Sequence, residues 1–193
     1  MKKHCGSALL LMGLLGSISV AAETDREGFY VGGDLGTTEL SFDEGSDSSS
    51  EYSVGVYGGY HFNDWFGIEG HIFGTGDYSD ESNFDSNAAV FSIAPKLTLQ
   101  FNDIFSGYAK AGLAYIVISN EVDTGYGTYT NDLSGVGYVL GLGVNAAVSD
   151  NLILRLGYEH TSGDLEFEHE SYYLNGDYTA KLSQFSLGIH YQF

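Results

Sequence analysis

The chain has little cysteine and few basic residues, and these shortages exclude several classes of protein. The single cysteine among its 193 residues is Cys5, so no disulfide can form within the chain. Seven Lys and Arg stand against 26 Asp and Glu, a formal net charge of −19, which makes nucleic acid a poor partner. Beyond residue 22 no run of 18 apolar residues occurs, so a transmembrane helix is excluded there.

The first 22 residues have the pattern of a secretory signal peptide. Lys2 and Lys3 give a basic start, residues 8–20 form an apolar core, and small residues precede Glu23. We expect cleavage after Ala22 and export from the cytoplasm, which leaves residues 23–193 as one mature domain. Cys5 precedes the apolar core, so it is not a lipoprotein acceptor.

Apolar residues of the mature domain recur at every second position, which is the period of a β-strand. In residues 152–158, LILRLGY, the Leu and Tyr residues fall on one side, and Ile153, Arg155 and Gly157 fall on the other. Residues 136–148 alternate in the same way. The predicted strands are residues 28–42, 51–62, 65–75, 88–101, 104–118, 135–148, 151–162 and 177–193.

Short turns and long polar loops alternate between these strands. The short turns are centred on Asn63-Asp64, Asn102-Asp103 and residues 149–151, where Asn and Asp tolerate tight turns. The long loops are residues 43–50, 76–87, 119–134 and 162–177. This alternation is typical of barrels in the bacterial outer membrane, with the short turns on the periplasmic side. The predicted fold is therefore all-β, an eight-stranded antiparallel up-and-down transmembrane β-barrel.

Alternation alone also fits a soluble lipocalin-like or avidin-like barrel, whose apolar face would point inward. Three features favour a transmembrane barrel. Glycines gather on the polar face, the apolar face is aromatic near the short turns, and an alternating apolar ladder leads to Phe193. The aromatic girdle at the membrane interface is predicted to contain Phe62, Trp65, Phe66, Phe101, Phe105 and Tyr191. Pro95 falls within a predicted strand, where we expect a local bulge or one missing ladder bond.

Charged residues on the polar face fall near the middle of the strands. The predicted interior charge cluster is Asp34, Glu69, Lys96, Lys110, Arg155 and Glu159. The same face carries Tyr30, Tyr57, His71, Tyr108, Asn145, Gln184 and His190. Buried charges are tolerated when they are paired, and we interpret this set as a polar plug that fixes the register of the barrel. The alternative is a narrow ion path lined by Lys96, Lys110 and Arg155, although eight strands leave room only for side chains.

Three segments carry a family resemblance: EGFYVGGDLG at 27–36, SVGVYGGYHF at 53–62 and FSLGIHYQF at 185–193. They resemble the OmpA/OmpX-like outer-membrane β-barrel proteins over essentially all of residues 27–193. The resemblance implies that the final ladder is a membrane-insertion signal read by the barrel-assembly machinery. This signal consists of Phe185, Leu187, Ile189, Tyr191 and Phe193. We expect no peptidoglycan-binding domain, because the chain ends at Phe193.

The tripeptide at 160–162 leaves an enzymatic alternative open. His160 and Ser162 resemble the His-x-Ser of PagL-type lipid A 3-O-deacylases, and their parity puts both on the lipid side. Glu166, Glu168 or Glu170 could orient the histidine. Against this alternative, Gly163 stands where that family has Asn, and the loop acids match no recognisable spacing.

The long loops are acidic, and we expect them to be solvated on the cell surface. Contact with an external ligand, or with lipopolysaccharide through bridging Ca²⁺ or Mg²⁺, is the functional alternative. The loop acids lack EF-hand spacing, the histidines lack zinc-site spacing, and no cofactor is predicted. We expect a monomer in the outer membrane of a Gram-negative bacterium, in contact with outer-membrane lipid and without enzymatic activity.

Overall fold

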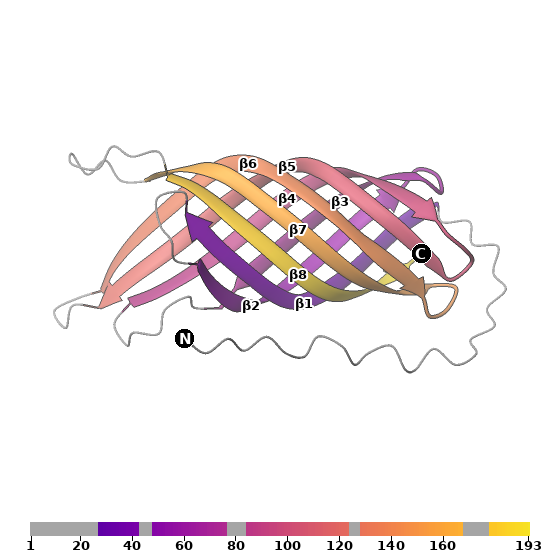
Figure 1. The fold of residues 1–193 in the computed structure, drawn as a ribbon, viewed down its shortest axis with the longest axis horizontal. Coiled ribbons are helices and arrows are strands. Elements are labelled where there is room, and N and C mark those ends of the chain that lie inside the picture. The colour runs from indigo at the N-terminus through magenta and orange to yellow at the C-terminus, as the bar shows by residue number, and fades with distance from the viewer. Residues whose placement is uncertain (1–26, 43–47, 77–83, 124–127, 168–177) are drawn as a thin grey trace, which may run out of the picture.

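The computed structural model describes residues 27–42, 48–76, 84–123, 128–167 and 178–193. They form eight strands that wind obliquely around one long axis (Figure 1). The strands are β1 (Gly28–Phe42), β2 (Ser48–His61), β3 (Phe66–Thr75), β4 (Phe84–Gln100), β5 (Phe105–Asp123), β6 (Thr128–Ala147), β7 (Leu152–Phe167) and β8 (Tyr178–Gln192). The described residues contain no helix long and apolar enough to cross a membrane.

Each strand pairs antiparallel with its chain neighbours, and β1 pairs with β8 to close the barrel. Following ladder partners once around the barrel leads from Ala146 through Leu154 and Ile189 back to Val136 on the same strand. This offset of ten residues (146 − 136) is the shear of the sheet, and it tilts the strands against the barrel axis. The predicted closed antiparallel barrel is confirmed.

Strand ends at the short turns agree with the prediction, whereas several strands are longer at the other end. Part of the predicted loop 119–134 is a β-ladder in which Ser119–Asp123 pairs with Thr128–Asp132. Strand β4 begins at Phe84 and β7 continues to Phe167, so parts of the predicted loops 76–87 and 162–177 are strand as well. The sequences of these extensions are mostly polar, with isolated apolar residues such as Leu165, so a prediction based on apolar alternation misses them.

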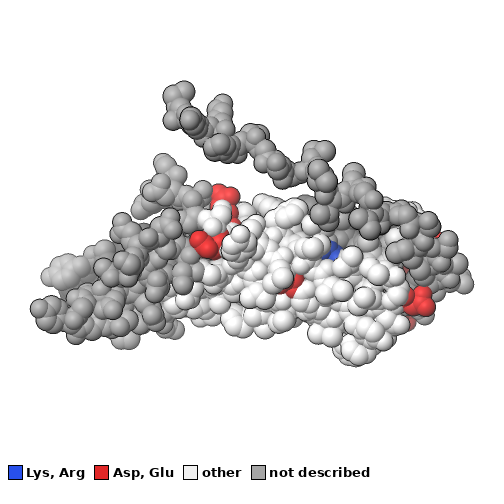
Figure 2. All heavy atoms as spheres, turned by 90° about the horizontal axis from the view of Figure 1, so that it is seen from below, with Lys and Arg blue, Asp and Glu red and all other residues white. Residues whose placement is uncertain are grey.

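The outer face of the barrel is apolar over its middle. Every second residue of β6 points outward, and among these Val136, Leu140 and Leu142 are 67%, 49% and 60% exposed. Figure 2 shows a mostly white surface across the middle of one side of the molecule, with a small red and a small blue patch there and larger red patches nearer its two ends. Such an apolar band between polar ends is typical of barrels in the bacterial outer membrane.

Pro95 interrupts one ladder without shifting its register. On β4, Ile93 pairs with Leu113 and Lys96 pairs with Lys110, but the two pairs in between are missing. On its other side Pro95 still pairs with Ile68 of β3. Because the residue sums on both sides of the gap are equal (93 + 113 and 96 + 110), no extra residue is inserted. Of the two expected alternatives at Pro95, the structure therefore shows the loss of ladder bonding and not a bulge.

The interior consists of two layers of opposite character. Along β5 the inward residues run from Ser106, Tyr108 and Lys110 near the short turn to Ala114, Ile116 and Ile118 near the long loops. The apolar layer at the long-loop end comprises Leu40, Phe73, Ala88, Val90, Ala94, Ala114, Ile116, Ile118, Leu133, Val139, Leu165, Ala180 and Leu182. The predicted polar plug thus fills only part of the interior. The position of a residue in the alternation shows that its side chain points inward. It does not show whether the interior around it is packed by apolar or by paired polar side chains.

Candidate functional site: the charged layer of the interior

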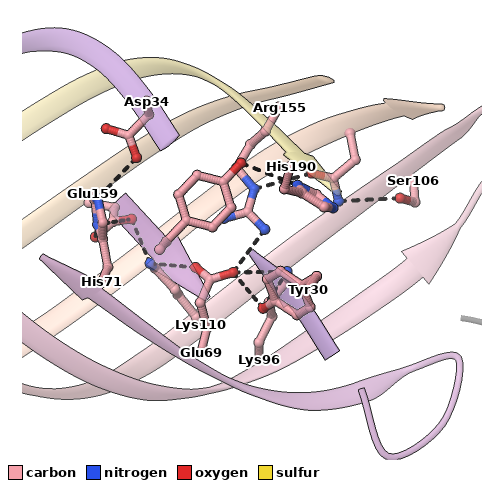
Figure 3. Close-up of polar contacts among 12 residues, drawn as sticks. Tyr30, Asp34, Glu69, His71, Lys96, Ser106, Lys110, Arg155, Glu159 and His190 are labelled. Atoms are coloured by element: carbon pink, nitrogen blue, oxygen red, sulfur yellow. Dashed lines mark hydrogen bonds and ion pairs between the residues drawn. The ribbon is translucent and has the colours of Figure 1, made fainter. Parts of the chain in front are cut away.

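Glu69 of β3 is the centre of the charged layer (Figure 3). Its Oε1 lies 2.8 Å from Lys110 Nζ, while its Oε2 lies 3.0 Å from Lys96 Nζ and 2.8 Å from an Arg155 guanidinium nitrogen. Tyr30 donates a further hydrogen bond of 2.7 Å to Oε2. Side chains from β1, β3, β4, β5 and β7 therefore meet at one carboxylate, which ties together strands that are not neighbours in the sheet.

His71 connects the other two acids of the layer. Its Nε2 lies 3.0 Å from Asp34 Oδ2 on β1, and its Nδ1 lies 3.2 Å from Glu159 Oε1 on β7. Both ring nitrogens can donate at the same time only when the imidazole carries two protons. Glu159 also lies 2.5 Å from Lys110 Nζ, so the chain of contacts continues from Asp34 through His71 and Glu159 to Lys110 and Glu69.

Aromatic rings surround the cations of this layer. The guanidinium carbon of Arg155 lies 4.1 Å from the ring centroid of Tyr57 and 4.7 Å from that of Tyr108. Lys96 Nζ lies 4.5 Å from the ring centroid of Tyr30, and the ammonium donates a hydrogen bond of 3.1 Å to the Tyr30 hydroxyl oxygen. Cation–π contacts of this kind stabilise charges that have lost their water.

Glycines on the inward face make room for these large side chains. A Cβ atom on Gly143 would lie 2.6 Å from a ring carbon of Tyr108, and one on Gly141 would lie 2.8 Å from Lys110 Cε. A Cβ on Gly59 would lie 2.5 Å from the Tyr30 hydroxyl. The gathering of glycines on the polar face thus has a packing cause, because an eight-stranded barrel is narrow.

The charged layer lies between the apolar layer and a small hollow. Toward the long loops lies the apolar layer, in which Val90, Ile116 and Val139 have no exposed surface. Toward the short turns lies a small hollow lined by His61, Asn145, Ala147, Asp150, Ile153, His190 and Gln192. The six residues of the predicted charge cluster are each at most 6% exposed. The arrangement can hold buried charges in fixed positions, and it leaves little space for a mobile ligand.

A resident metal ion finds no site in the part of the chain that the structure describes, where no group of three or more His, Cys, Asp or Glu side chains is placed to hold one. Each carboxylate of the charged layer already faces Lys, Arg or His. A divalent ion would have to displace these cations, so the chemistry of the layer is charge pairing.

The structure gives His160 a different partner from the one its sequence neighbourhood suggests. His160 Nδ1 lies 3.2 Å from Ser183 Oγ across the β7–β8 ladder. Ser162 has outward parity, but it is only 4% exposed, between its ladder partners Tyr138 and Lys181. The side chains of Glu166, Glu168 and Glu170 lie outside the described residues. The described contacts therefore contain a His–Ser pair, but it involves Ser183 rather than Ser162.

Aromatic residues lie around the short-turn end of the outer face, where the predicted girdle was placed. Phe62, Trp65, Phe101 and Tyr191 are 51%, 60%, 60% and 47% exposed, and Phe66 and Phe105 are partly exposed. The rings of Phe62 and Phe66 stack with their centroids 5.6 Å apart. The predicted insertion signal is also outward-facing, because Phe185, Leu187, Ile189, Tyr191 and Phe193 are all between 44% and 70% exposed.

Sequence reasoning placed the six charged residues together but missed two features of the site. His71 was on the predicted polar face, yet its role as the link between Asp34 and Glu159 depends on the distance across the lumen. The Tyr30 hydrogen bond to Glu69 likewise joins residues 39 positions apart. Inward parity was the only sequence signal for either feature, and parity carries no information on which strands face each other.

The fold and the charged layer together define a small eight-stranded barrel with a packed interior and an apolar outer band. The amino-acid sequence of the chain is similar to those of known outer-membrane proteins. The family model for the outer membrane protein beta-barrel domain matches residues 8–193. A 22 kDa outer membrane protein of Rhizobium leguminosarum bv. viciae is 31% identical over 168 residues, which cover 84% of this chain and 71% of that protein. The chain therefore belongs to the outer-membrane β-barrel domain family, and it is a bacterial outer-membrane protein.

Solved structures show the same fold at low sequence identity. Neisserial surface protein A has a TM-score of 0.68 and 21% identity, with 86% of this chain and 97% of that chain covered. Ail, the attachment invasion locus protein of Yersinia pestis, has a TM-score of 0.60 and 17% identity, with 86% and 99% covered. At these identities the likeness concerns the fold and not the activity.

Proposed function

We propose that this protein is an integral outer-membrane barrel with a structural and surface-presenting role, sealed to ions and without catalytic activity. The barrel would stabilise the membrane and hold the acidic loops 43–50, 76–87, 119–134 and 162–177 on the cell surface. The apolar outer band and the similarity to outer-membrane proteins support this placement.

The observation that carries the proposal is the apolar layer across the interior at the long-loop end. An ion crossing the barrel would lose its water among Phe73, Ile116 and Leu182, which are at most 2% exposed. Transfer of an unpaired ion into such surroundings costs many kcal/mol. A barrel blocked in this way does not conduct, which leaves its outer surface and loops to interact with other molecules.

Planar-bilayer recording tests whether the barrel is sealed. We expect the refolded protein to give no current steps above background, while a general porin added to the same membrane gives them. Uniform steps that depend on protein concentration would contradict the proposal and support the ion path lined by Lys96, Lys110 and Arg155.

Cysteine labelling tests the orientation, because residues 23–193 contain no cysteine. Ser50 of β2 lies at the long-loop end and Asp103 lies in a short turn, and both are exposed. We expect a membrane-impermeant maleimide to label Ser50→Cys on intact cells and to label Asp103→Cys only after lysis. The opposite pattern would reverse the orientation.

Lipid A mass spectrometry tests the absence of catalysis. We expect membranes incubated with the folded barrel to keep all their acyl chains. Loss of one 3-O-linked chain that is abolished by Ser162→Ala or by Ser183→Ala would make this protein a hydrolase.

The monomeric state and the partners belong to the same proposal. The outward ladder from Phe185 to Phe193 would be the segment that the barrel-assembly machinery recognises. Lipid and lipopolysaccharide would cover the apolar band, and the loops would meet any ligand from outside.

A further inference from the structure

The apolar band is shorter on one side of the barrel. Beyond Leu35 on β1, Tyr158 on β7 and Phe185 on β8, the outward positions become polar. The residues with this outward parity are Thr37, Glu39, Ser41, His160, Ser162, Asp164, Thr179, Lys181 and Ser183, of which Ser162 is only 4% exposed. We call these nine residues the polar panel. The ladder places them side by side, since His160 pairs with Ser183, which lies opposite Glu39, and Ser162 pairs with Lys181, which lies opposite Ser41.

The opposite side of the barrel stays apolar at the same height. Outward apolar or small residues extend over 105–117 on β5 but only over 152–158 on β7, although both strands start at short turns. At about 2.5 Å of height per tilted residue, the band on β7 spans roughly 15 Å, against about 25 Å for a barrel in the outer membrane. The polar panel therefore begins roughly 15 Å below the first polar outward residue of β5 on the opposite side.

Hydrogen bonds hold the panel together. His160 Nδ1 lies 3.2 Å from Ser183 Oγ, and Tyr158 donates to the same Ser183 oxygen at 3.4 Å. Thr179 donates to Asp164 Oδ1 at 2.8 Å. The ring of Tyr138 lies 6.4 Å from that of His160, so an aromatic side chain borders the panel on the β6 side. A surface that carries a carboxylate and several hydroxyl groups is nevertheless costly to place against lipid tails.

The panel also carries one basic side chain, Lys181. Among the described residues, Lys181 is the only Lys or Arg that lies outside the interior charged layer. Glu39 and Asp164 are the acids of the panel, so its charge does not suit a bare phosphate ion. A ligand with many hydroxyl groups and one phosphate within reach of Lys181 fits this mixture better, because hydroxyls both donate and accept.

We infer that the polar panel binds the phosphorylated sugar headgroup of an outer-leaflet glycolipid such as lipid A. The headgroup would lie against β7, β8 and β1 at the height of His160, just beyond the last outward apolar residue of β7. This inference rests on the membrane placement in the proposed function, but it concerns the outer face and not the sealed interior. The two can therefore fail separately.

Thermal unfolding in nanodiscs tests the inference. The folded barrel is placed in phosphatidylcholine nanodiscs with or without lipid A, and the unfolding temperature is read from gel mobility. We expect lipid A to raise this temperature by about 5 °C or more. Lys181→Gln combined with Ser183→Ala should abolish most of the rise, and Glu39→Gln should enlarge it, because an acid near the phosphate is removed. Ser119→Ala, at an outward serine on β5, serves as the matched control and should keep the full rise.

Three results would overturn the inference. Lipid A could give no rise in the wild type, or it could give the same rise in the Lys181 and Ser183 double variant. Inorganic phosphate alone could reproduce the rise, which would make the ligand a free anion and not a lipid. Unheated gel mobility reports whether each variant is folded, and if the double variant does not fold, the opposite shift expected for Glu39→Gln still decides the question.

Discussion

The two layers fill the narrow interior of the barrel in different ways, one with paired charges and the other with apolar side chains. In the charged layer Glu69 contacts three cations, and in the apolar layer Ile116 and Val139 are fully buried among other apolar side chains. Both layers lie within the same closed sheet and use positions of the same parity. The comparison teaches that a closed barrel accepts either solution, provided that every buried charge finds its partner.

The layers differ in what they specify. Apolar side chains of suitable volume can replace one another at modest cost, whereas Glu69 needs cations from β4, β5 and β7 at fixed places. A slip of one strand by a residue would turn its charged side chain toward the apolar outer face. The charged layer therefore selects one register, and the apolar layer supplies burial and the seal.

Removing the central carboxylate is expected to have the largest effect. Glu69→Gln leaves Lys96, Lys110 and Arg155 without their shared partner in a buried site, and breaking such a network costs about 3–5 kcal/mol. Urea unfolding of the barrel refolded in lipid vesicles measures the loss. Asp64→Asn, at an exposed acid in a short turn, is the matched control and should change stability by less than about 0.5 kcal/mol. Equal stability of both variants would show that the charged layer does not stabilise the barrel.

A cavity in the apolar layer should cost somewhat less. Ile116 has no exposed surface, and Ile116→Ala is expected to lower stability by about 2–4 kcal/mol. Ile116→Val should lose only about 1 kcal/mol, because one methylene group is removed. Both values come from the same urea titration. Losses that do not follow the removed volume would argue against a close-packed layer.

The histidine link should have an intermediate effect that depends on Asp34. His71→Gln carries no positive charge and has one donor nitrogen in place of the two ring nitrogens that face Asp34 and Glu159, so we expect a loss of about 1–3 kcal/mol. Adding Asp34→Asn should recover part of it, since the amide no longer needs a cation. A double-mutant cycle measures this coupling. Strictly additive losses would mean that His71 and Asp34 are not coupled.

The smallest effect is expected at the interrupted ladder. Pro95→Ala restores a backbone N–H opposite Ala111 of β5, which is worth about 0.5–1.5 kcal/mol, while the added freedom of the unfolded chain offsets part of the gain. We expect a net change within about 1 kcal/mol and slower amide exchange at residue 95 than at an unpaired position. Fast exchange there would show that the gap has a cause other than proline.

Much of the barrel could be predicted because its strands have two distinct environments. Leu152, Leu154 and Leu156 alternate with buried Ile153 and Arg155, so the period of two is visible in the sequence. The extension of β5 and β6 beyond Ile118 and Leu133 was missed, because residues 119–123 and 128–132 are mostly polar and show no apolar alternation. Inward parity alone also suggested a polar interior, and the apolar layer corrected that expectation.

The sequence by itself determined the number of strands, their order, the face that each side chain occupies and the set of six charges on the inner face. Alternation and turn chemistry are local, so each can be read from neighbouring residues. Only the tertiary structure decided which charges meet, that His71 joins Asp34 to Glu159, that an apolar layer closes the long-loop end, and that a polar panel interrupts the outer band. These features depend on the shear of the closed sheet, which sets the relative height of residues on different strands and leaves no mark on any single strand.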